Sequence, residues 1–393
     1  MRLELHFLQN FPPANLNRDD TGTPKDCQFG GERRARISSQ CIKRSIRTSP
    51  VFEQTLGEQI GQRTKRFVEP LAKRLEKKHG HSEEEAQGLA ADALDELIGL
   101  ADSNGEVQKT EVLHYAAQEE IEDLAERVHS ATEGDKTISD AIGDFKEKNQ
   151  GYARAVDIGL FGRFLADTPE LTLEAASQVA HAISTNRVSM EFDYYTAVDD
   201  LNPDEETGAG MIGTTGYNSS CFYRYMLLDV EHLARNLSPD EDPTASSFER
   251  AIVGTEAFTR AAVAAIPTGM QTSFAAQARP QLVLAVVRPG KSTPMSLVNA
   301  FEDPARPQNG TSLVQDSVSK LDRHWGEMTS MYGSKESDAF LAMLDSAGSV
   351  DNLEPVRVET ENGQGEIEAL VQQVTGALED AANDQTEDGE VVA

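Results

Sequence analysis

The first nine residues alternate between apolar and polar side chains, a pattern that is typical of a strand. The apolar positions are Leu3, Leu5 and Phe7, and the polar positions are Arg2, Glu4 and His6. Because successive side chains of a strand point to opposite faces, the pattern predicts a strand with one buried and one solvated face. A helix is predicted to begin near Ser38, because serine is a preferred N-cap residue.

Between residues 53 and 183 the sequence is helical in character. Apolar residues recur there three and four positions apart, as expected for helices that bury one face. One such face is Ala86, Leu89, Ala93 and Leu97, and another is Leu113, Ala117, Ile121, Leu124 and Val128. A further helix with an apolar face is predicted over residues 246–266.

Further strands are predicted at residues 187–198, 219–230 and 281–288. The connection between the first two contains Gly208, Gly210, Gly213 and Gly216. It lacks the lysine of a phosphate-binding loop, so we interpret it as a hairpin tip. The order strand, helix, helical insertion, strand, strand, helix, strand predicts an α+β, ferredoxin-like fold of the kind found in RNA-recognition motifs.

The chain has a formal charge of −30 at pH 7, yet one segment is strongly basic. Residues 33–47 hold six cations and no acidic residue: Arg33, Arg34, Arg36, Lys43, Arg44 and Arg47. At the start of the predicted helix, Ser38, Ser39 and Gln40 are expected to direct hydroxyl and backbone N–H groups outward beside these cations. That arrangement suits a phosphate or a run of phosphates. The alternative is a solvated basic helix face.

Composition argues against several classes of protein. No run of 18 apolar residues is present and the N-terminus lacks the apolar segment of a signal peptide, so we expect a cytoplasmic protein without a membrane span. Cys27, Cys41 and Cys221 have no CxxC spacing, which indicates neither a disulfide framework nor a zinc site. No cofactor is therefore expected. The acidic excess indicates either a saline cytoplasm or a requirement for solubility.

Several chemically interesting groups have two interpretations. Asp19 and Asp20 either hold a metal ion for phosphodiester cleavage or belong to a loop that pairs with Arg18. His79 and His81 form a weak metal pair, and a structural role on a helix is expected for His181. Each clustered aromatic ring either belongs to the core or stacks on the bases of a single strand. The clusters are Phe192, Tyr194 and Tyr195; Phe222, Tyr223 and Tyr225; and Phe161 with Phe164.

One long motif resembles the opening of a known family. It reads NRDD at residues 17–20 and FGGERRARISSQCIKR at residues 29–44. This motif is similar to the CasC family, the crRNA-binding backbone subunit of the type I-E CRISPR surveillance complex Cascade. The likeness returns in VDIGLFGRF (156–164), AHAISTNRV (180–188), DYYTAVDDL (193–201), SSCFYRY (219–225) and PMSLVNAFE (294–302).

The resemblance implies a molecule shaped like a right hand. The palm comprises residues 1–52, 184–192 and 218–350, the helical fingers comprise 53–183, and the β-hairpin thumb comprises 193–217. Residues 351–393 form an acidic C-terminal helix and tail, whose composition predicts a helix over 367–378 and disorder beyond residue 378.

The resemblance also implies a non-enzymatic scaffold with many partners. Several copies are expected to assemble head to tail into a helical filament along a crRNA and to present guide bases for pairing with target DNA in antiviral defence. The other implied partners are the remaining Cascade subunits: the large subunit, the small subunits, a capping subunit and the crRNA-processing endonuclease.

Twelve residues are assigned to RNA by this resemblance. The palm residues are Arg18, Lys25, Ser38, Gln40, Lys43, Arg44 and Arg47, the finger residues are Arg163 and Phe164, and the thumb residues are Tyr195 and Thr196. Gln271 is expected to contact a phosphate, although Met270 and Thr272 stand where relatives can carry basic residues. Contacts to the RNA backbone carry no sequence information, as a subunit that accepts any guide requires.

Two other functions stay open. Type III relatives have a backbone subunit that cuts RNA with a loop aspartate, and by that resemblance Asp19 or Asp20 would make this chain a metal-dependent ribonuclease acting on complementary RNA. The other alternative is a monomeric RNA-recognition protein with base-specific contacts.

Overall fold

The computed structural model describes residues 1–101, 108–197, 211–240, 242–290, 292–308, 310–333, 337–361 and 363–390. The chain forms two compact units. The sheet unit comprises Met1–Phe52, Gln178–Leu227 and Phe258–Ala393, and the helical unit comprises Glu53–Ser177 and Leu228–Ala257. The fold is mixed α/β, and the part of the chain described here contains no helix that is both long and apolar enough to cross a membrane.

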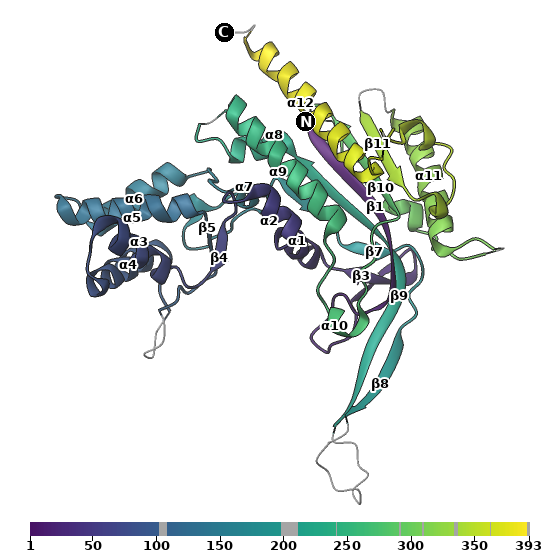
Figure 1. Ribbon diagram of the computed structural model, residues 1–393, viewed down its shortest axis with the longest axis horizontal. Helices are drawn as coiled ribbons and strands as arrows, with labels where there is room; N and C mark the ends of the chain where they lie inside the picture. The colour runs from purple at the N-terminus through teal and green to yellow at the C-terminus, as the bar shows by residue number, and fades with distance from the viewer. Residues whose placement is uncertain are drawn as a thin grey trace, which may run out of the picture. The chain divides into compact units, whose positions relative to one another are not determined.

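Within the described residues, nine strands form one sheet with the order β11-β10-β1-β9-β7-β3-β2, and β6 and β8 both pair with β9 (Figure 1). The pairings of β10 with β1 and β11, of β3 with β2 and β7, and of β9 with β7 and β8 are antiparallel. The strands are β1 (Arg2–Ala14), β2 (Asp26–Phe29), β3 (Glu32–Ile37), β6 (Ser177–Val179), β7 (Ala182–Ser184), β8 (Glu191–Ala197), β9 (Met211–Asp229), β10 (Leu282–Arg288) and β11 (Asp338–Met343). The strands predicted at residues 1–9, 219–230 and 281–288 are therefore confirmed, although β1 and β9 are longer than predicted.

Strand β1 is buried on both faces, so the prediction of a solvated polar face is wrong. Glu4 and His6 are as fully buried as Leu5. β1 lies inside the sheet between β10 and β9, and the face that carries Leu8 packs against an apolar cluster that includes Leu321 of α11. The two polar side chains are tolerated because neighbouring groups bind them.

Those neighbours come from β9, from β10 and from the loop that follows β10. The Glu4 carboxylate accepts hydrogen bonds from Arg288, from the Tyr225 hydroxyl at 3.2 Å and from the backbone N–H of Met295 at 3.0 Å. His6 Nδ1 lies 2.8 Å from the Tyr223 hydroxyl. Burial, with a smaller contribution from the Arg288 charge, lowers the pKa of His6 to about 3, so the imidazole is neutral at physiological pH.

The predicted helices near Ser38 and over residues 246–266 are confirmed as α1 and α9. The helices with residues in the sheet unit are α1 (Ser39–Arg47), α2 (Pro50–Leu56), α9 (Ala245–Ala264), α10 (Gln271–Phe274), α11 (Leu313–Tyr332) and α12 (Glu366–Glu390), with 3-10 turns η2 (Val298–Phe301), η3 (Asp345–Ala347) and η4 (Glu354–Val356). Helix α12 continues well past residue 378, where disorder was predicted. Ala382 is still buried, and alanine and glutamate are good helix formers, so the helix extends beyond its last large apolar residue.

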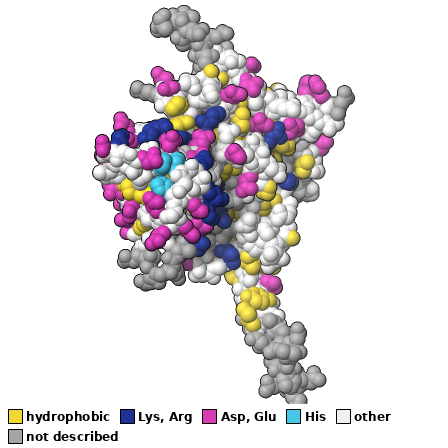
Figure 2. Space-filling view, turned by 60° about the vertical axis from the view of Figure 1, so that its left-hand side comes forward, with side chains coloured by type: hydrophobic (Ala, Val, Ile, Leu, Met, Phe, Trp, Pro, Cys, Tyr) yellow, Lys and Arg dark blue, Asp and Glu magenta, His cyan; other side chains and the backbone are white. Residues whose placement is uncertain are grey.

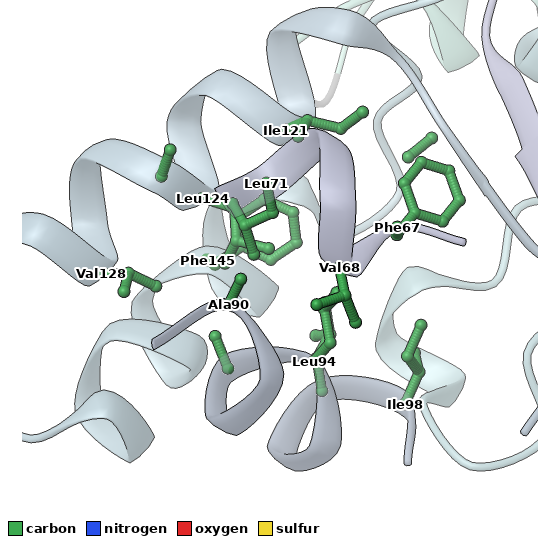
Figure 3. Packing of buried hydrophobic residues seen from close by; sticks show 14 of the residues in the cluster. Phe67, Val68, Leu71, Ala90, Leu94, Ile98, Ile121, Leu124, Val128 and Phe145 are labelled. Carbon is green, nitrogen blue, oxygen red and sulfur yellow. The ribbon is translucent and has the colours of Figure 1, made fainter. Parts of the chain in front are cut away.

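The helical unit has an apolar core between α3, α4, α5 and α6, shown in Figure 3. Its elements are α3 (Val68–His79), α4 (Glu83–Ile98), α5 (Gln118–Glu133), α6 (Ile138–Asn149), α7 (Val156–Phe161), α8 (Val230–Asn236), the 3-10 turn η1 (Pro169–Leu171) and a two-stranded sheet of β4 (Gln62–Thr64) and β5 (His114–Ala116). The apolar face predicted for α4 is confirmed, because Ala86, Ala93 and Leu97 are buried and Leu89 packs against the same core. On the other predicted face, Leu113 precedes α5 and is 50% exposed, because β5 intervenes.

A hairpin formed by β8 and residues 211–217 of β9, here called the hairpin arm, extends from the sheet in Figure 1. The predicted strand at residues 187–198 begins only at Glu191. Of the palm strand predicted at 184–192, only Ser184 at the end of β7 and the first two residues of β8 are in strands, and residues 185–190 are not. Gly213 and Gly216 are strand residues rather than a tip; Gly208 and Gly210 lie outside the described residues. A Cβ atom on Gly213 would lie 2.3 Å from Tyr195 Cζ on the paired strand, so glycine makes room for the ring.

Candidate nucleic-acid interface

Helix α1 presents a mixed surface of cationic and polar side chains. Ser38 is its N-cap, and the Ser38 hydroxyl accepts a hydrogen bond from the Cys41 N–H at 3.3 Å. Ile42 and Ile46 are buried and anchor the helix. Their burial leaves Gln40 and Arg44 exposed and Lys43 and Arg47 partly exposed, with the pKa of Lys43 lowered by burial. The cations predicted on α1 are thus held at the edge of the sheet unit by an apolar anchor.

The first N–H groups of α1 are engaged within the protein. The Ser38 N–H donates to Asn17 Oδ1 at 2.9 Å, and the Ser39 N–H donates to His181 Nδ1 at 3.4 Å. The Cys41 N–H also has a partner within the protein, the Ser38 hydroxyl. Three backbone N–H groups that were expected to face a phosphate therefore already donate hydrogen bonds to protein groups. That expectation is wrong for these groups, so a phosphate here would be held mainly by side chains.

The basic segment does not form one continuous surface strip. Arg34 is fully buried, and its guanidinium donates four hydrogen bonds to backbone carbonyls. The acceptors and distances are Ser184 O at 3.0 Å, Thr185 O at 2.9 Å, Phe301 O at 2.7 Å and Glu302 O at 3.1 Å. Arg34 therefore joins distant segments of the sheet unit. Arg33 instead pairs with Asp26, and Arg36 donates to the Asp26 carbonyl at 3.2 Å.

A cavity of about 540 Å³ adjoins α1 within the sheet unit. The loop after β1, α1 and the segment before α10 all contribute to its wall. The polar side chains in this wall are Asn17, Arg18, Asp19, Asp20, Arg44, Ser45, Thr48 and Thr268. The structure thus brings together Arg18 and Arg44, two exposed residues that are predicted to bind RNA and are 26 positions apart in the sequence. Asp19 and Asp20, the carboxylates of the ribonuclease alternative, line the same cavity. Lys25 is partly exposed at the far end of the same loop, where its N–H donates to Asn17 O at 2.9 Å.

Asp19 shapes its own loop. Its Oδ1 accepts hydrogen bonds from the N–H groups of Thr21 and Thr23, both at 2.9 Å, and from the Thr21 hydroxyl at 2.8 Å. These bonds, the Thr21 hydroxyl first, lower the pKa of Asp19. The described part of the chain contains no group of three or more His, Cys, Asp or Glu side chains arranged to hold a metal ion. The loop interpretation of Asp19 therefore has direct geometric support.

His129 lies beside His79 and His81, the histidine pair that the sequence identifies in the helical unit. His81 Nε2 lies 3.0 Å from His129 Nδ1, and the rings of His79 and His129 are 4.4 Å apart. Figure 2 shows histidine side chains grouped among carboxylates on the surface. Glu85 and Glu133 approach the outer nitrogens of His81 and His129 at 3.3 and 3.5 Å. Both ring nitrogens of His81 and of His129 therefore lie against protein groups.

The hairpin arm carries exposed aromatic rings on both of its faces. Phe192, Tyr194 and Tyr195 are 64%, 62% and 43% exposed, and Thr196 is also exposed. Hydrophobic side chains are visible along this arm in Figure 2. The core interpretation is therefore wrong for these three rings, although it is right for the buried Phe222 and Tyr223.

Gln271 opens α10, a single turn flanked by Met270 and Ala275, both with φ of 47°. Its side-chain amide is used locally. Nε2 donates to Pro267 O at 3.0 Å, and Oε1 accepts from Gln277 at 3.1 Å. Gln271 therefore stabilises the conformation of its own loop through both ends of its side-chain amide.

Arg163 and Phe164 lie in the helical unit, with opposite exposures. Arg163 is buried, donates to Leu171 O at 2.8 Å and pairs with Glu120 at 2.9 Å. Because this guanidinium is enclosed, the structure gives it a structural role and removes it from the direct RNA contacts predicted by sequence. Phe164 is 82% exposed and stays available for stacking.

Sequence reasoning missed the supporting roles of Asn17 and His181. His181 lies in the loop between β6 and β7, not on a helix, and its Nδ1 accepts from both Arg36 and Ser39. With Nδ1 as the acceptor, Nε2 carries the proton of the neutral imidazole. Burial and the charges of Arg36 and Lys25 lower the pKa of His181, which favours that neutral form. No local signal predicts this contact, because Ser39 and His181 are 142 positions apart.

The chain matches the CT1975-like protein family over residues 3–373. It is similar to a solved chain described as "CRISPR RNA-guided surveillance complex, pre-nicking", with a TM-score of 0.79, 28% sequence identity and coverage of 96% of this chain and 100% of that chain. A chain of a "CRISPR RNA-guided surveillance complex" is similar with a TM-score of 0.68, 24% identity and the same coverages, which shows the fold alone. No curated protein matches the chain. Because the family match covers nearly the whole sequence, the chain belongs to the CT1975-like protein family.

Proposed function

We propose that this chain is a backbone subunit of a CRISPR RNA-guided surveillance complex and binds the ribose-phosphate backbone of a guide RNA. One observation carries the proposal: Arg18 and Arg44 line the same cavity in a sheet unit that also bears the aromatic hairpin arm. An anionic protein that concentrates exposed arginines at one cavity is suited to a polyanion. The solved chain similar at 28% identity comes from such a complex.

The finer features of the proposal follow from the sequence resemblance. The complex is of type I-E, copies repeat head to tail along the RNA, and guide bases between them stay free to pair with target DNA. The exposed Tyr195 and Phe164 rings are suited to stack on or displace a base, because stacking tolerates any base. The partial strand order β10-β1-β9-β7, with α1 and α9 in the connections, supports the ferredoxin-like description.

The subunit is proposed to act without catalysing a reaction. In support, the Asp19 carboxylate is held by the N–H and hydroxyl groups of its own loop. To test this, the assembled complex is incubated with complementary RNA and Mg²⁺. Intact RNA is expected, whereas regular cuts that disappear in Asp19→Ala or Asp20→Ala would identify a ribonuclease.

RNA binding is tested by reversing the charge of both cavity arginines in one variant, Arg18→Glu with Arg44→Glu. The matched control variant is Arg306→Glu with Arg323→Glu, at two exposed arginines outside the cavity wall, so both variants change the net charge equally. The cavity variant should keep its unfolding temperature but lose guide RNA. In a plot of log K against log salt concentration, loss of two phosphate contacts should reduce the slope by about 1.4 for a single strand. Equal binding by the two variants would refute the site.

A further inference from the structure

Asn15 lies directly after β1 and is fully buried. Its side-chain Nδ2 donates one hydrogen bond to Gly22 O at 3.1 Å and a second to Gly216 O at 2.9 Å. Gly22 belongs to the loop that carries Arg18, and Gly216 belongs to the hairpin arm. A single amide group therefore bridges the two segments on which the proposed RNA contacts depend.

Two packing contacts strengthen this junction. A Cβ atom on Gly216 would lie 3.3 Å from Pro24 Cδ, so Pro24 of the loop packs closely on the arm. The ring of Tyr217 in the arm lies 5.7 Å from that of Phe274 in α10. The loop after β1 and the segment around α10 thus both contact the base of the arm.

The chemistry of Asn15 matches this bridging position. Two carbonyl acceptors require two N–H donors from one short side chain, which asparagine supplies and aspartate, serine and leucine do not. The carbonyls also fix the amide orientation, because the flipped form would place Oδ1 against two oxygens. Oδ1 is buried without a hydrogen-bond partner among the described groups.

We propose that Asn15 is a positioning residue that couples the loop of residues 16–25 to the hairpin arm, so that phosphate binding by the loop also orders the aromatic rings of the arm. The inference rests on the proposed function for its RNA step, but the mechanical coupling exists without RNA. Because Nδ2 donates to both backbone segments, displacement of the loop moves the donor that holds the Gly216 carbonyl. The arm and the loop then respond to RNA as one element.

The coupling is tested first in RNA-free protein by hydrogen exchange of the backbone amides of residues 213–217. Asn15→Ala is compared with Asn10→Ala, a control within β1 whose position in the sheet is held by a bond from its backbone N–H to the Gln281 side chain. Exchange of the arm is expected to rise at least tenfold in Asn15→Ala only, with the unfolding temperature of the rest of the chain unchanged. If Asn15→Ala does not fold, Asn15→Ser removes the same donors with a smaller change in polarity. Unchanged exchange of the arm would overturn the proposal.

The second measurement adds a short single-stranded oligoribonucleotide of mixed sequence. In the wild type, bound RNA should slow exchange in both the loop and the arm, whereas in the Asn15 variant it should slow exchange in the loop and leave the arm at its RNA-free rate. Equal protection of the arm in both proteins would overturn the coupling. If the oligoribonucleotide binds neither protein, the proposed function fails and so does the RNA step, while the RNA-free exchange separately reports whether Asn15 joins the two segments.

Discussion

Replacing Arg34 with methionine tests whether this arginine of the basic segment stabilises the fold or binds RNA at the surface. Arg34 lies among residues that the sequence assigned to one phosphate-binding strip, yet its guanidinium is buried and donates to four carbonyl oxygens. Methionine keeps most of the apolar stem and removes the donors. The variant should therefore lose stability rather than only RNA affinity.

The decrease in the free energy of unfolding caused by Arg34→Met can be estimated from the hydrogen bonds that are lost. Each bond from a charged donor contributes about 1.5–3 kcal/mol, and a buried acceptor left unpaired costs about 1–3 kcal/mol. Relief from burying the cation offsets part of this loss, because desolvating an ion is itself costly. Because the relief cancels a large part of the lost bonds, we expect a net decrease of about 3–5 kcal/mol in the free energy of unfolding of the sheet unit, which is typical of removing one partner from a buried charged interaction.

Urea unfolding followed by circular dichroism measures this change, with Arg33→Met as the matched control. Arg33 is exposed and pairs with Asp26 at the surface, so its loss should cost about 1 kcal/mol or less. An Arg34 variant within about 1 kcal/mol of wild type would refute the structural assignment. A variant that keeps its stability but no longer binds RNA would instead show that Arg34 belongs to the RNA-binding residues.

Two further predictions concern pH and the arm. Burial lowers the pKa of both His6 and His114 to about 3, so below pH 6.5 these imidazoles bind protons in the unfolded chain but not in the folded chain. Lowering the pH from 7 to 5 should therefore decrease the free energy of unfolding by about 2 kcal/mol for each histidine. Urea midpoints that do not change over that pH range would contradict this. Gly213→Val should push the Tyr195 ring away and speed amide exchange in the hairpin arm with little change elsewhere; an arm that exchanges as in the wild type would show that the glycine is dispensable.

The elements that the sequence predicted correctly are those governed by local signals. The α1 start at Ser38 depends on a cap within three residues, and the α4 face depends on spacings of three and four, so both could be found without knowing the tertiary structure. The strand β10 was found because an apolar run is bounded by prolines.

The errors arise where partners are distant in the chain. Arg34 reaches a carbonyl 267 positions away, and no periodicity in its own segment reveals this contact. The polar face of β1 was predicted to be solvated because the sequence does not show that Glu4 meets Arg288, 284 positions later. Similarly, the resemblance assigns Arg163 to RNA, whereas the structure pairs its guanidinium with Glu120, 43 positions earlier in the chain.

The central claim is that this chain holds a guide by its backbone, irrespective of base identity. The most direct test measures the affinity of the purified protein for two oligoribonucleotides of equal length and unrelated sequence at one salt concentration. The account predicts binding constants that agree within about threefold, because phosphate contacts do not distinguish bases. A preference of about a hundredfold for one sequence, or no binding of either, would contradict it.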